Sequence, residues 1–223
     1  MKIKILVVLQ LLCIGVVFGQ KKEKDTTDAE FDLYIGVGLS NQKWNINKNL
    51  VGANWATINE SLPEFTVGFG KNGKKFSGDI ELSLAGNPYK EGDNKTELAS
   101  STGRLSVAYN LVNKPKFLLA SGLNIAYTGT QLDVFNQNGT VDLNNLNPNA
   151  NSGHVQLNNR MLFVGPSISA YLFKNTKYKV RARASYEFAL TNGKWRSDFL
   201  NVANTVKEQG NNRLMFGIVM FSN

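Results

Sequence analysis

The chain has little of the chemistry that disulfides and metal sites need. Its 223 residues include one cysteine, Cys13, and one histidine, His154. Cys13 lies in an N-terminal segment that we expect to be removed, so the mature protein would have no thiol. Without thiols there is neither a disulfide framework nor a thiolate metal site, and a single histidine is a poor basis for any metal centre. We predict no metal, no cofactor and no catalytic residue.

Long hydrophobic runs are also scarce, and the main one is N-terminal. Residues 5–17 are apolar with few breaks and follow Lys2 and Lys4. Small residues at Val17 and Gly19 then mark a cleavage site. The run has about 13 residues, whereas a spanning helix needs roughly 20, which favours a secretory signal peptide. The expected division is a signal peptide at 1–19, a short periplasmic segment at 20–30 and a single domain at 31–223.

Acidic residues are fewer than basic ones. The net charge is +8, and loss of Lys2 and Lys4 would leave +6. A basic chain can bind nucleic acid, but secretion argues against that partner. Many of the cations instead fall in three short turns, where they could meet phospholipid head groups or simply be solvated. These turn residues are Lys71, Lys74, Lys75, Lys114, Lys116, Lys174 and Lys177.

What the chain does contain is an alternation of apolar and polar residues with a period of two, which is typical of β-strands. From 31 to 40 the odd positions are apolar and the even ones are polar or small. The last segment is apolar on both faces, so its phase is ambiguous. That last segment covers about 213–221, and the six between it and the first cover about 63–71, 76–84, 104–111, 117–128, 162–172 and 178–188.

Short and long connections alternate between these segments. Four connections are long: roughly 43–61, 88–97, 132–155 and 192–210. Short turns at one end and long loops at the other are typical of an outer-membrane barrel. We therefore predict an all-β protein, an eight-stranded antiparallel up-and-down transmembrane β-barrel.

The polar face should line the lumen. It consists mainly of small residues, which suit the narrow interior of an eight-stranded barrel. Its few charges are balanced, as buried charges must be, although a solvated face with a chance balance is the alternative. The predicted lumen network comprises the acids Asp32, Glu64, Asp79, Glu81 and Glu187 and the bases Arg104, Lys179, Arg181, Arg183 and Arg213.

Aromatic residues recur near the ends of the predicted strands, which is typical of interfacial girdles. The inner girdle is predicted from Phe31, Phe69, Phe76, Tyr109, Phe117, Phe173, Tyr178 and Phe221, although Phe173 and Phe221 fall on the other face of their strands. The outer girdle is predicted from Trp44, Tyr89, Tyr127, Phe135, Phe188 and Trp195.

The pattern resembles the small outer-membrane barrel families, the OmpA-barrel and OmpX-like group. It is especially similar to the eight-stranded proteins of Bacteroidetes-type bacteria known by the domain name "outer membrane protein beta-barrel domain". The resemblance covers about residues 31–223 and rests on the pattern at 34–39 and 213–221. It implies residence in the bacterial outer membrane, with lipid as a partner.

Several functions are compatible with such a barrel. We favour a non-enzymatic barrel with an occluded lumen whose external loops bind an envelope protein, a surface glycan or the subunits of a complex. A narrow passive channel and a soluble lipocalin-like ligand-binding barrel are alternatives. A rim enzyme would need His154 to act with Ser152, oriented by Asp133 or Asp142.

Overall fold

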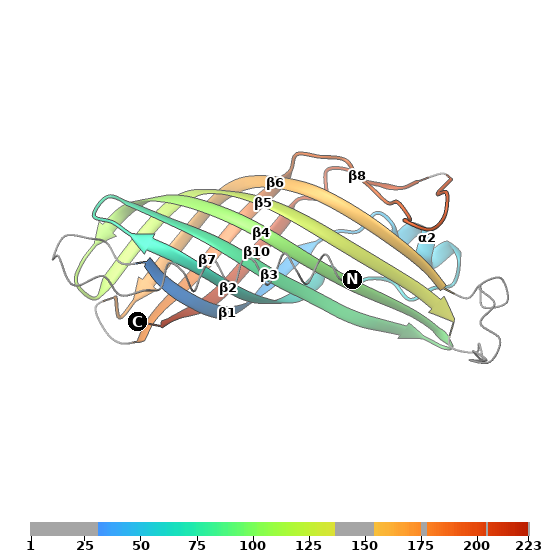
Figure 1. The fold of residues 1–223 in the computed structure, drawn as a ribbon, viewed down its shortest axis with the longest axis horizontal. Helices are drawn as coiled ribbons and strands as arrows, with labels where there is room; N and C mark the ends of the chain where they lie inside the picture. The colour runs from blue at the N-terminus through green and yellow to red at the C-terminus, as the bar shows by residue number, and fades with distance from the viewer. Residues whose placement is uncertain (1–30, 137–153, 175–177, 204, 223) are drawn as a thin grey trace.

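The computed structural model describes residues 31–136, 154–174, 178–203 and 205–222. Within them, eight antiparallel strands form a closed barrel, which confirms the predicted fold class (Figure 1). The predicted signal peptide and the segment 20–30 lie outside the described residues. The barrel strands are β1 (Phe31–Gln42), β2 (Ser61–Asn72), β3 (Phe76–Glu91), β4 (Asn94–Asn113), β5 (Phe117–Asn136), β6 (His154–Leu172), β7 (Tyr178–Ala189) and β10 (Arg213–Ser222).

Closure of the ring joins the first strand to the last. β1 and β10 pair from Leu33 opposite Ser222 to Gln42 opposite Arg213, so the ladder has no free edge. Three small elements lie in the connections at the external end: α2 (Asn47–Gly52), β8 (Gly193–Lys194) and β9 (Lys207–Glu208). In the described part of the chain, no helix has the length and apolar character needed to cross a membrane.

Apolar side chains face outward around the barrel. On β1, Leu33 and Val37 are 52% and 64% exposed, whereas Tyr34 between them is 1% exposed. The pairing of β10 with its neighbours also resolves the phase of that strand, because it buries Arg213 and exposes Leu214. An outward apolar belt suits lipid, whereas a soluble lipocalin-like barrel would hide its apolar face inside.

Four consecutive strands rise above the others at the external end. β3, β4, β5 and β6 have 16, 20, 20 and 19 residues, whereas β1, β2 and β7 have 12 and β10 has 10. The long connection predicted at 88–97 is therefore wrong: β3 and β4 pair as far as Glu91 opposite Asn94. Gly92, at a φ of 59°, makes the tight turn. The alternation of apolar and polar residues is weak in this part of β3 and β4, because both faces of a strand outside the bilayer can contact water.

The closed ladder predicts heat-modifiable migration on denaturing gels. Unboiled and boiled samples should run at different positions, because a barrel without an edge strand resists detergent until it is heated. Paired samples of purified protein on one gel provide the measurement. Identical mobility, together with recovery in the soluble periplasmic fraction, would contradict the membrane assignment.

Candidate functional site

Carboxylates on β3 meet arginines on β7 across the bore. The two strands are separated by the same number of steps in either direction round the ring, so they face each other. Arg183 Nη2 donates to Glu81 Oε1 at 2.5 Å and to Oε2 at 2.6 Å, and Arg181 Nη1 donates to Asp79 Oδ2 at 3.0 Å. The Glu81, Arg181 and Arg183 side chains are buried, and the Asp79 side chain is 9% exposed. These pairs fill the interior from one wall to the other.

A second group of ion pairs joins β4, β7 and β10. Glu187 accepts hydrogen bonds from Arg104 Nε at 2.8 Å and from Arg213 Nη2 at 2.6 Å. Arg104 also pairs with Glu81, which links this group to the first. The Glu81 and Glu187 side chains are 0% exposed, and each contacts at least two guanidinium groups. Multiple pairing offsets the cost of burying these charges.

Nine of the ten residues predicted for the lumen network make ion pairs. Lys179 pairs with Asp32 near the short-turn end. Glu64 is the exception: it is 5% exposed on the inner face of β2, and its Oε2 has no hydrogen-bond partner among the described residues. The alternation predicted which side chains point inward, but it held no information on which of them would meet.

Tyr34 connects the ion pairs to an apolar layer at the short-turn end. Its hydroxyl lies 2.9 Å from Asp79 Oδ1 and 3.2 Å from Glu81 Oε2. The ring crosses Gly68, where a Cβ would lie 2.5 Å from the Tyr34 ring, so only glycine leaves room for it. Phe221 packs on Tyr34 with ring centroids 5.0 Å apart. The full layer comprises Tyr34, Leu118, Ala120, Tyr171, Val219 and Phe221.

Aromatic residues near the short turns face outward, where the inner girdle was predicted. Phe76 and Tyr109 are 61% and 48% exposed, and their ring centroids are 5.5 Å apart. Phe69 and Phe117 also point outward and are half-buried. The side chains of Phe31 and Tyr178 lie outside what the structure describes.

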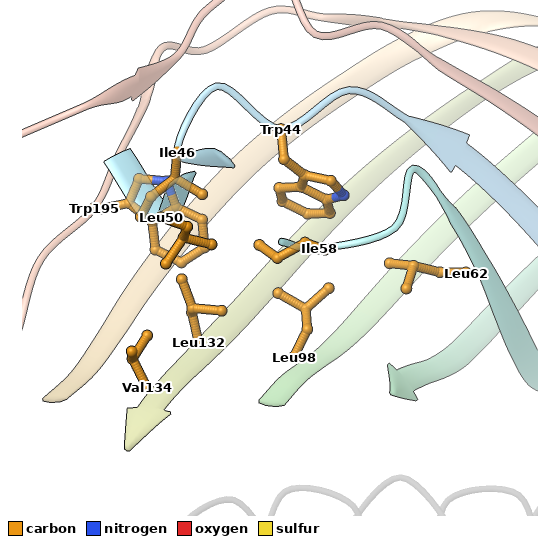
Figure 2. Packing of buried hydrophobic residues seen from close by; sticks show 9 residues of the cluster. All are labelled: Trp44, Ile46, Leu50, Ile58, Leu62, Leu98, Leu132, Val134 and Trp195. Carbon is orange, nitrogen blue, oxygen red and sulfur yellow. The ribbon is translucent and has the colours of Figure 1, made fainter. Parts of the chain in front are cut away.

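Trp44 and Trp195 do not face the membrane interface, so the outer-girdle prediction is wrong for these two residues. Tyr127 and Phe188, also predicted for that girdle, do face outward and are 53% and 46% exposed. Trp44 and Trp195 are 7% and 1% exposed, with ring centroids 6.4 Å apart. Both belong to connections that turn back over the mouth of the barrel and pack on the inner face of β4 and β5 (Figure 2). We call this packed group the cap; its residues are Trp44, Ile46, Leu50, Ile58, Leu62, Leu98, Leu132, Val134 and Trp195.

A buried carboxylate holds the two connections of the cap together. Glu208 is 0% exposed. Its Oε2 accepts from the Asn45 backbone N–H at 2.7 Å and from Asn211 Nδ2 at 2.5 Å. Its Oε1 accepts from the Ile46 backbone N–H at 3.1 Å and from Trp195 Nε1 at 2.8 Å. No pattern in the sequence pointed to Glu208, because it lies in a polar connection without periodicity.

Glu208→Gln should loosen the cap without opening the barrel. The amide would turn an N–H₂ group toward backbone and side-chain donors, at a cost of about 1–3 kcal/mol. We expect a red shift of tryptophan fluorescence and faster tryptic cleavage near Lys48 and Arg196. The difference in gel migration between unboiled and boiled samples, called the heat shift below, should be unchanged. Glu60→Gln, at an exposed position of the connection between β1 and β2, is the matched control. Equal cleavage rates for both variants would contradict a structural role for Glu208.

His154 lies on the outer face of β6 and contacts Asp133. The distance from Nε2 to Asp133 Oδ1 is 2.9 Å, and the His154 side chain is 55% exposed. Asp133 Oδ2 also accepts from Gln131 Nε2 at 2.7 Å. The candidates Ser152 and Asp142 lie outside the described residues. Within the described ranges, no cluster of three or more His, Cys, Asp or Glu side chains could hold a metal.

Comparison with known proteins rests on structure, since no protein-family model and no curated sequence matches the chain. Neisserial surface protein A gives a TM-score of 0.52 at 8% identity, over 87% of this chain and 98% of that one. Ail, the attachment invasion locus protein of Yersinia pestis, in complex with the heparin analogue sucrose octasulfate, gives 0.50 at 7% identity with the same coverages. The chain has the fold of the small outer-membrane β-barrels. At sequence identities of 7–8%, the structural similarity shows the fold alone.

Proposed function

We propose that this protein is a non-enzymatic barrel of the bacterial outer membrane that binds a protein partner at its external end. Residues 1–19 would direct the export of the chain as a signal peptide and would then be cleaved off before the barrel enters that membrane. The observation that carries the proposal is an asymmetry between the two ends. Side chains fill the bore from the short-turn end to the mouth. At the external end, by contrast, the cap supports exposed apolar side chains.

The packing of the bore disfavours a channel. The apolar layer around Phe221 lies at the short-turn end, and the ion pairs around Glu81 and Glu187 occupy the middle. Met161 and Phe163, 3% and 0% exposed, form a further cluster with Ala126 beyond them. The cap follows at the mouth. A solute would have to displace several of these layers.

The external end carries an apolar tip that the cap supports. Phe199 and Leu200 are 77% and 59% exposed. The segment that presents them is anchored by Trp195, which lies in the cap, and by a two-way backbone bridge from Arg196 to Asn158 on β6. Adjacent large apolar side chains on a well-anchored projection are typical of a protein-binding surface, whereas a glycan would favour polar groups.

Site-specific crosslinking tests this proposal. A photo-crosslinking amino acid at exposed Asn201, next to the tip, should give one defined adduct in intact cells. Adding Phe199→Ser and Leu200→Ser should abolish that adduct while leaving the heat shift intact. The same crosslinker at exposed Lys90, at the tip of the β3–β4 hairpin, is the positional control. No adduct at Asn201, or an adduct insensitive to the double substitution, would refute the proposal.

A further inference from the structure

Three cations from three neighbouring strands lie side by side beyond the end of β7. Asn158 and Arg196 form an antiparallel bridge, with backbone N–H groups donating at 2.6 and 2.9 Å. Continued two residues toward the barrel, the antiparallel register of that bridge would set Lys194 opposite Arg160. β8 and β9 then pair Lys194 with Lys207. We call Arg160, Lys194 and Lys207 the basic row.

The basic row points away from the interior. Gly193 and Glu208 pair with each other one residue along β8 and β9. Both point inward: Glu208 is fully buried, and a Cβ on Gly193 would meet Met161 within 2.7 Å. Because successive residues of a strand alternate in direction, their neighbours Lys194 and Lys207 face outward. All three members of the basic row are exposed.

The basic row borders the external edge of the apolar belt. Leu162 on β6 pairs with Tyr127 on β5, whose outward ring is 53% exposed. Arg160 is the next outward residue of β6, about 7 Å further along the strand. Leu190, which directly follows β7, is 58% exposed, and its backbone N–H donates to the Leu162 carbonyl oxygen at 2.8 Å. The cations therefore lie at the level of lipid head groups, directly above apolar side chains.

Among the residues that the structure describes, the basic row has no acidic partner. In the described ranges, no carboxylate lies within ion-pair distance of any of the three cations. Asp198, on the same connection, has its carboxylate bonded to Asn158 Nδ2 at 3.0 Å. Like charges opposite each other on neighbouring strands repel, which destabilises the pairing unless an external anion neutralises them.

We propose that the basic row binds the phosphate groups of an anionic lipid in the external leaflet. Arginine and lysine both bind phosphate, and Arg160 can do so through two N–H groups at once. The apolar residues beneath the row would contact the acyl chains of the same lipid. This inference requires only that the barrel be embedded in a membrane, and it is independent of the partner proposed for the tip at Phe199.

Lipid retention in nanodiscs tests the inference. The barrel is placed in nanodiscs of phosphatidylcholine with a minor fraction of lipid A, which carries two phosphates, and bound lipid is quantified by native mass spectrometry. Arg160→Gln, Lys194→Gln and Lys207→Gln together should weaken lipid A binding by about a hundredfold, since each cation near a membrane surface contributes about 1 kcal/mol. The matched control removes three other exposed external lysines, Lys43, Lys48 and Lys90, and should leave binding unchanged.

The heat shift verifies that each variant is folded. If the triple variant fails to fold, Lys207→Gln alone should weaken binding about fivefold. Equal losses in the row variant and the control would overturn the inference, because they would reflect net charge alone. It would also be overturned if the row bound inorganic phosphate or sucrose octasulfate in the absence of lipid as tightly as lipid A, since a soluble anion would then be its ligand.

Discussion

Replacing Glu81 by glutamine should lower the free energy of unfolding of the barrel by about 3–5 kcal/mol. Glu81 pairs with Arg104, Arg181 and Arg183, and its side chain is 0% exposed. The amide keeps the shape of the carboxylate but removes the charge, so three buried guanidinium groups lose a shared partner. Urea titrations in detergent micelles, followed by far-UV circular dichroism, would measure the change in midpoint.

Glu97→Gln is the matched control for that experiment. Glu97 pairs with Lys95 on the external part of β4, where its side chain is 44% exposed. An exposed pair of this kind contributes about 0–1 kcal/mol. A Glu81 variant no less stable than the Glu97 variant would show that the lumen network adds little to stability.

The double variant Arg181→Ser/Arg183→Ser should conduct ions, whereas the unmodified barrel should be silent or flicker. The two arginines reach from β7 to Asp79 and Glu81 on β3, so they close the narrow bore across its width. Serine removes that bulk, leaves Asp79 without an ion-pair partner and leaves Glu81 paired with Arg104 alone, which would also admit water. Single-protein recordings in planar bilayers would measure the leak and its preference for cations.

Exposed arginines provide the control for the conductance experiment. Arg160→Ser/Arg196→Ser makes the same chemical change on the outer face of the external end and should remain silent. Steady, ion-selective conductance from the unmodified protein would instead restore the passive-channel alternative. A silent double variant that passes the heat-shift test would show that other layers, such as the one around Phe221, close the bore by themselves.

The external connections show where prediction from sequence stops. Trp44 and Trp195 follow strands at positions suited to a membrane interface, yet they pack against each other in the cap. Glu208 had no pattern to distinguish it from any other loop acid, although four donors converge on it. Loop residues lack a regular period, so their neighbours depend on where distant segments fold.

The amino-acid sequence by itself determined the strand count and, for every strand except β10, which residues share the polar and charged face. Those properties follow from an alternation that one polypeptide segment carries locally, and the small residues and balanced charges of the polar face favoured placing it in the lumen. The pairing of β10 with its neighbours fixed the facing of that strand. Only the tertiary structure decided which charges pair, because β3 and β7 face each other only after the ring closes. It also decided that the connections fold over the mouth and that Arg160, Lys194 and Lys207 align, since both depend on contacts between segments far apart in the chain.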